Sequence, residues 1–313
     1  MIRSTMQLAV LPSFSRGQRL RFLVMFLAVP LSGMEVAQAA SVPAGCATIH
    51  HAAQTSATGV TLDHVTVSAG GASLQASRQT LSGPDNGSAQ DLADAASVVL
   101  LSALVGRHES ACSNWLENEG RLAEQQLEAG RKLAIAWKNV NVRRNTLNIR
   151  SDTAQLALAT TGTTATATLS LSGVTTAGVN APSLLPSDAR ANFSLPVSEL
   201  AALMASTGGK AKQLPAVHVT INSLTAQRDT VTLSGNGRAT LTGEHDSASA
   251  SGHLEIQDIS GLVDRARQDS QMKVAAALIL ARVVSHRSGN ANTWDTTWEG
   301  GVLTVNGVPL PLH

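Results

Sequence analysis

Tyrosine is absent from this 313-residue chain, and all aromatic residues together make up only 3% of it. Proteins that hold single-stranded nucleic acids stack the bases on aromatic side chains, so this composition argues against that class. The core must therefore be built mainly from alanine, valine, leucine and threonine.

An excess of basic charge is missing as well. The formal net charge is +1, and residues 1–39 carry four arginines and one glutamate, so without them the charge falls to −2. A generally basic surface for nucleic acid or anionic lipid headgroups is therefore not expected.

Residues 1–39 have the features of a secretory signal peptide. Their arginines precede an apolar run, residues 22–31, and Ala37-Gln38-Ala39 offers a cleavage site before Ala40. The run is too short to span a bilayer as a helix. We expect export, with cleavage near Ala39 and no spanning segment in the mature chain. The alternative is that the segment stays attached as an anchor.

The chain contains only two cysteines, Cys46 and Cys112, and both lie beyond the predicted cleavage site. An exported protein folds in an oxidising compartment, which favours a disulfide between them. Such a bridge would close a long loop and stabilise the fold by ~4 kcal/mol. The alternative is a pair of buried free thiols.

One apolar pattern occurs three times along the chain. Polar residues fill most positions between the apolar ones, which predicts two short alternating strands. In the last copy we expect a one-residue slip at Asn222-Ser223 and a turn at residues 227–229. The three sets are Val60, Leu62, Val65, Val67, Ala72, Leu74; Ile135, Trp137, Val140, Val142, Leu147, Ile149; and Val219, Ile221, Leu224, Ala226, Val231, Leu233.

Three long helices are expected among these strands. The first follows Ser88, a candidate N-cap with Asp91 in the capping-box position, and it is apolar enough to be buried. The second covers residues 109–130, and its charged residues indicate a solvated face: Glu117, Glu119, Arg121, Glu124, Glu128 and Arg131. The third covers about residues 261–286, and its expected buried face consists of Leu262, Val263, Ala266, Val274, Ala277, Leu278, Ala281 and Val284.

We predict an α+β protein, mainly β, with curved antiparallel sheets built from repeated two-strand modules and packed by apolar helices. Pro182 and Pro186 mark a boundary, which divides the mature chain into β-plus-helix regions at 40–185 and 186–313. Residues 40–58 are expected to be a flexible lead-in. The pair His50-His51 is not expected to bind metal, because neighbours in a strand point to opposite sides.

No familiar catalytic pattern occurs in the sequence. It contains no G-x-S-x-G elbow, no H-E-x-x-H pair and no phosphate-binding glycine loop. We therefore predict no catalytic, cofactor or metal site. A secreted hydrolase that uses His245 or His253, which lie among acidic residues, is the enzymatic alternative.

The C-terminal part resembles a known family. Residues 198–206 (SELAALMAS), 249–266 (SASGHLEIQDISGLVDRA) and the closing G-x-L-x-x-N-G-x-P-L, residues 301–310, are similar in pattern and order to bacterial AsmA-like envelope proteins and a related uncharacterised periplasmic family. The resemblance covers residues 187–313. It implies a periplasmic protein with a long twisted sheet and an apolar groove, which acts in outer-membrane assembly or lipid movement. AsmA-like proteins usually keep a membrane anchor, in contrast to the cleaved signal predicted here.

These observations lead to one functional hypothesis and two alternatives. We expect a non-enzymatic envelope protein that binds lipid or a protein partner along an apolar sheet face, with no cofactor and no nucleic acid. The residues expected to line a groove, or else a core, are Val219, Ile221, Leu224, Val231 and Leu233. The alternatives are the secreted hydrolase and a surface or adhesive module.

Overall fold

A computed structural model describes residues 42–56, 58–84, 87–106, 110–207, 215–242 and 248–310, all within one unit of the chain. The predicted signal peptide, its cleavage site near Ala39 and the candidate His245 lie outside the described residues. Strands are the commonest element and helices come second, which confirms the prediction of a mainly β protein.

In the described part of the chain, the strands form one antiparallel sheet whose order follows the sequence, with β7 beside β5 and β12 beside β13. The sheet continues across the boundary predicted near Pro182, because β6 pairs with β8. The strands are β1 Thr48–Ser56, β2 Gly59–Ala69, β3 Ala72–Ser82, β4 Leu133–Arg144, β5 Leu147–Thr161, β6 Thr164–Ser172, β7 Thr175–Ala177, β8 Asp188–Pro196, β9 Val217–Arg228, β10 Val231–Leu241, β11 Ser249–Gln257, β12 His286–Ser288, β13 Ala291–Glu299, β14 Val302–Val305 and β15 Val308–Leu310.

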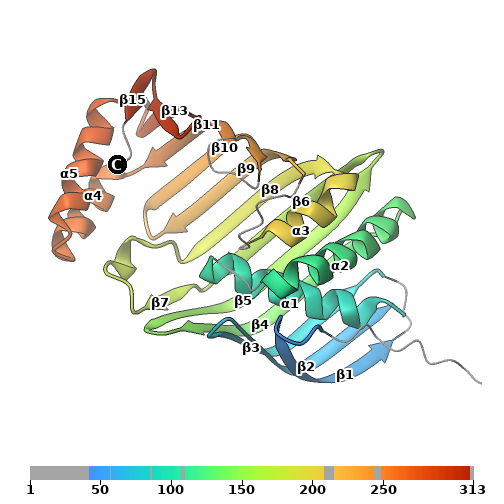
Figure 1. Ribbon diagram of the computed structural model, residues 1–313. Coiled ribbons are helices and arrows are strands. Elements are labelled where there is room, and N and C mark those ends of the chain that lie inside the picture. The colour runs from blue at the N-terminus through green and yellow to red at the C-terminus, as the bar shows by residue number, and fades with distance from the viewer. Residues whose placement is uncertain are drawn as a thin grey trace, which may run out of the picture. The chain divides into compact units, whose positions relative to one another are not determined.

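Two groups of helices accompany the sheet. Helices α1 to α3 lie over the strands of the first half, and α4 and α5 lie at the far end, with β8 to β10 visible between the two groups (Figure 1). The helices are α1 Ala89–Val105, α2 Ser110–Glu128, α3 Leu200–Ser206, α4 Ile259–Gln268 and α5 Met272–Val283, with the 3-10 turns η1 Pro182–Leu184 and η2 Val197–Glu199.

Helix α1 is fixed to the sheet by a buried polar network as well as by apolar packing. The Gln79 side chain of β3 donates to the Ala93 carbonyl at 2.7 Å. The Ser97 hydroxyl donates to Gln79 Oε1 at 2.8 Å and accepts from the Trp137 indole at 3.0 Å. Because each of these groups finds a partner, the network positions α1 without leaving an unpaired polar atom among Gln79, Ser97 and Trp137.

Strand β9 contains the predicted slip. Leu224 pairs with Gly235 and Ile221 pairs with Gly237, so Asn222 and Ser223 together oppose one residue of β10. This is a β-bulge, which keeps Ile221 and Leu224 on the same face of the sheet. The predicted turn at residues 227–229 was placed too early, since β9 continues to Arg228 and β10 begins only at Val231.

Three further local predictions are wrong. The expected lead-in contains strand β1, which pairs with β2. Ser88 precedes α1, but its side chain makes no capping hydrogen bond. The single helix predicted at 261–286 is two helices, because the chain turns at Ser270, whose φ is 59°.

Candidate functional site

The central strands carry an apolar strip on one face of the sheet. We define this apolar strip by six half-buried side chains: Phe193 on β8, Ile221 and Leu224 on β9, Leu233 on β10, and Leu254 and Ile256 on β11. Pairing places them together, since Phe193 lies opposite Ile221 and Leu233 lies opposite Ile256. All but Phe193 belong to neither of the two hydrophobic cores.

Glycines leave part of the apolar strip without side chains. Gly235 lies between Leu224 and Leu254 in the cross-strand row, and Gly237 pairs directly with Gly252. A Cβ at Gly235 would lie 2.6 Å from the His253 carbonyl oxygen, and one at Gly237 would clash with the neighbouring backbone. Close approach of the strands therefore requires glycine here, and the larger side chains stand on either side of a bare stretch of backbone.

On each side, the apolar strip borders a part of the sheet that helices cover. Toward the first half, Phe193 and Val219 pack against the main core. Toward the C-terminus, Leu254 pairs with Trp294 of β13, and the Trp294 indole donates to the Ala281 carbonyl of α5 at 2.8 Å. The strip thus runs from the edge of the main core to the base of α5.

The five residues that the sequence predicted to line a groove or a core differ in their burial. Ile221, Leu224 and Leu233 are half-buried members of the strip. Val219 packs at the edge of the main core, and Val231 is buried, only 7% exposed. The sequence missed Leu254 and Ile256, although their alternation in the segment around residues 252–257 is the same kind of signal.

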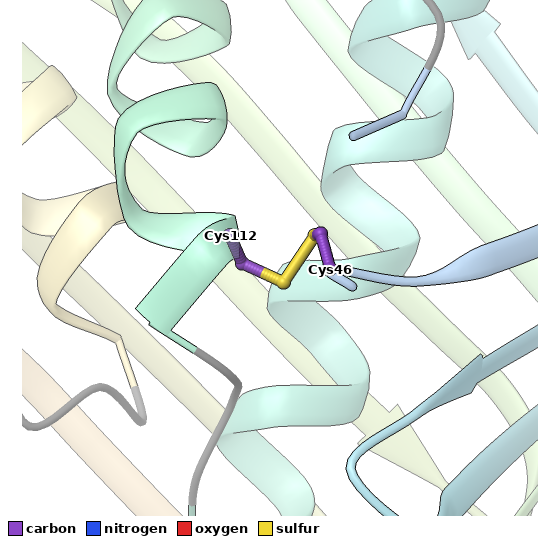
Figure 2. Close-up of a disulfide and its surroundings, with 2 residues drawn as sticks. All are labelled: Cys46 and Cys112. Atoms are coloured by element: carbon purple, nitrogen blue, oxygen red, sulfur yellow. A yellow bond between two sulfur atoms is a disulfide. The ribbon is translucent and has the colours of Figure 1, made fainter. Parts of the chain in front are cut away.

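The predicted disulfide is present. Cys46 and Cys112 are joined with their Cα atoms 4.6 Å apart, and both are buried (Figure 2). The bridge fixes the segment before β1 to the first turn of α2. It confirms the pairing derived from the two cysteines and fits an oxidising compartment.

A buried acidic group lies between α1 and α2. His51 Nε2 lies 3.0 Å from Asp94 Oδ1. Burial raises the pKa of Asp94, and the nearby His51 partly offsets this effect. Burial also raises the pKa of Glu119 to about 7, with further contributions from the charges of Asp91 and Asp94.

The expectation that Glu119 belongs to a solvated face is therefore wrong. Its side chain is only 1% exposed and lies near Asp91 and Asp94 of α1, and α3 packs against α2 as well. A Cβ at Gly120 would clash with Ala201 of α3, and Glu124 accepts a hydrogen bond from the Ala201 backbone N–H at 2.9 Å. The sequence could not show this contact, since α3 lies some eighty residues further along the chain.

Two other histidines pair with carboxylates near the surface. His253 Nδ1 lies 2.8 Å from Asp295 Oδ1, and His218 Nδ1 lies 2.9 Å from Glu199 Oε1. Both pairs are solvated, with the Asp295 side chain 75% exposed. Within the described ranges, no group of three or more histidine, cysteine, aspartate or glutamate side chains is arranged to hold a metal ion.

No protein-family model, no curated protein and no solved structure matches this chain. Among the described residues, no helix has both the length and the apolar content needed to cross a membrane.

Proposed function

We propose that the chain is an exported, non-enzymatic protein of the bacterial envelope that binds a lipid acyl chain along the apolar strip. The observation that carries this proposal is a row of half-buried apolar side chains that helices leave uncovered between α3 and α4. A contiguous apolar surface that is exposed to water usually indicates a binding site.

The dimensions of the strip support a lipid chain. Neighbouring strands lie about 4.8 Å apart, so the five strands β8, β9, β10, β11 and β13 extend over about 19 Å. An acyl chain crosses half of a hydrocarbon layer about 30 Å thick, so it spans about 15 Å. A chain laid across the strands would contact Leu224 and Leu254 and pass over the bare backbone at Gly235.

The shape of the strip also favours a lipid. Because Gly235, Gly237 and Gly252 lack side chains, the strip presents bare backbone between its larger apolar side chains. A flexible chain of methylene groups can follow such a surface, and each buried methylene contributes about 0.8 kcal/mol.

The finer architectural features and the location belong to the same proposal. We infer that the pairs β2–β3, β4–β5 and β9–β10 are copies of one module in a curved sheet. The pattern similarity of residues 187–313 to AsmA-like envelope proteins supports a periplasmic role in lipid movement or outer-membrane homeostasis.

Lipid extraction from the purified full-length chain, read by mass spectrometry, tests the proposal. We expect Leu224→Asp to retain at most about a tenth of the lipid bound by the wild type, because a charge beside an acyl chain costs more than 1.4 kcal/mol. Thr225→Asp is the matched control, since Thr225 is exposed on the opposite face of the same strand.

Two outcomes would contradict a lipid site. One is the absence of bound lipid from the wild-type chain. The other is equal lipid content in Leu224→Asp and Thr225→Asp. If a protein copurifies instead and is released only by Leu224→Asp, the occupant of the strip is a polypeptide.

A further inference from the structure

Helix α5 is apolar around most of its circumference, yet only one side of it is covered. Ala275 and Leu278 pack toward the small core that α4 provides through Val263 and Ala266. The predicted buried face is thus only partly buried, since Val274 and Val284 on that face are 38% and 43% exposed.

An adjoining side of α5 carries larger apolar side chains in water. Met272 is 63% exposed, Leu280 67% and Val283 75%, and Ile279 beside them is 41% exposed. Residues three and four apart share one side of a helix, so these four form one stripe. The helix has 12 residues, so the stripe is about 18 Å long. We call these four residues the outer stripe of α5.

The segment that contains the outer stripe is basic. Between Asp269 and Asp295 the chain contains no acidic residue, but it contains Lys273, Arg282 and Arg287. All three basic side chains are exposed, but Arg282 donates a hydrogen bond to the Ser260 hydroxyl of α4 at 3.2 Å, so Lys273 and Arg287 supply the charge for a partner. The near-neutral net charge of the whole chain therefore conceals a basic stretch at α5, which favours a partner that is both apolar and anionic.

A second copy of the chain fits these features poorly. A symmetric contact through the outer stripe would bring the same basic residues of both copies together, and like charges across an interface oppose association. A bilayer containing anionic lipids supplies an apolar layer for the stripe and negative headgroups for the cations.

We propose that α5 is a membrane-surface helix that lies in the interface of a bilayer rich in anionic lipid. The outer stripe enters the acyl region, and Lys273 and Arg287 contact the headgroups. Occupancy of the apolar strip is not required for this contact, because the two surfaces consist of different residues.

Vesicle cosedimentation of the full-length chain tests this contact. The vesicles contain phosphatidylglycerol and phosphatidylcholine in equal parts, or phosphatidylcholine alone. We expect Leu280→Ser/Val283→Ser to lower the partition coefficient on the mixed vesicles at least about tenfold. Leu241→Ser, which changes an exposed apolar side chain at the end of β10, is the control and should bind like the wild type. All variants retain residues 1–41, so any binding by that segment is common to them.

The basic residues are tested separately. We expect Lys273→Gln/Arg287→Gln to lower binding to the mixed vesicles about tenfold or more and to leave binding to phosphatidylcholine unchanged, since each cation near an anionic surface contributes ~1 kcal/mol. Both side chains are exposed, so these substitutions should not alter the melting temperature.

Three results would overturn the proposal. The first is absence of binding by the wild type, and the second is equal binding by the outer-stripe variant and its control. The third is a wild-type dimer that Leu280→Ser/Val283→Ser converts to a monomer, because the occupant would then be a second copy. Failure of the lipid-extraction test leaves this inference standing, because extraction probes Leu224 and cosedimentation probes α5.

Discussion

Replacing Glu119 by glutamine tests whether one buried carboxyl makes the stability of the fold depend on pH. Burial, and then the charges of Asp91 and Asp94, raise the pKa of Glu119 from 4.5 to about 7. In the unfolded chain the carboxyl regains its ordinary pKa. Between the two values the folded state therefore binds more protons than the unfolded state, so stability falls as the pH rises through this window.

The magnitude follows from the two pKa values. Each pKa unit corresponds to ~1.4 kcal/mol, so ionised Glu119 costs the folded state up to about 3 kcal/mol once the pH exceeds the raised pKa of about 7. Below the ordinary pKa the carboxyl is protonated in both states, and this cost disappears. Glutamine keeps the size of the side chain but cannot ionise. We expect Glu119→Gln to be more stable than the wild type above the window and about equally stable below it.

Urea unfolding followed by circular dichroism, with the disulfide intact, measures the difference at a series of pH values. Glu117→Gln is the matched control, because Glu117 lies on the same helix in an exposed ion pair with Arg121. Such a pair contributes less than ~1 kcal/mol, and no comparable pH-dependent gain is expected from its loss. If the curves of free energy of unfolding against pH for the wild type and Glu119→Gln run parallel through the window, the reasoning is refuted.

Three further substitutions test the packing around this site. Gly120→Ala should lower the free energy of unfolding by about 1–3 kcal/mol, because the added Cβ clashes with Ala201, whereas Gly87→Ala, which meets no neighbouring atom, should have a far smaller effect in the same urea titration. Ser97→Ala should lower the free energy of unfolding by about 1–3 kcal/mol for each partner left unpaired, Gln79 Oε1 and the Trp137 indole. The same urea titration measures this loss. Cys112→Ser should cost ~4 kcal/mol and abolish the mobility difference between reducing and non-reducing gels; an unchanged difference would contradict an intramolecular bridge.

The parts of the fold predictable from the sequence are those set by local pattern. Alternating apolar residues identified the strands around Ile221 and Leu224, and even the bulge between them, because a slip in alternation is visible in the chain itself. The apolar character of α1 was visible in the same way. The disulfide followed from there being only two cysteines in a chain predicted to be exported.

The misses arise where a distant segment decides the environment of a residue. Glu119 has the pattern of a solvated helical position, but it is buried beside Asp91 and Asp94 of α1. Residues 259–283 have the apolar periodicity of one long helix, but Ser270 adopts a positive φ and folds α5 back along α4. Periodicity identifies an apolar side of a helix but does not state how many neighbours are available to cover it.

The two proposed surfaces, the apolar strip and the outer stripe of α5, are connected through the sheet. The cross-strand row passes from Leu224 over Gly235 to Leu254 and Trp294, and Trp294 is hydrogen-bonded to the Ala281 carbonyl of α5. The strip therefore ends at the base of the helix that we propose to lie in the membrane surface. A lipid leaving that surface would meet Trp294 first and the bare backbone at Gly235 next. If the outer stripe delivers lipid to the strip, Leu280→Ser/Val283→Ser should slow the loading of lipid from vesicles without changing the amount bound at equilibrium. Leu224→Asp should reduce the amount bound and leave vesicle binding intact.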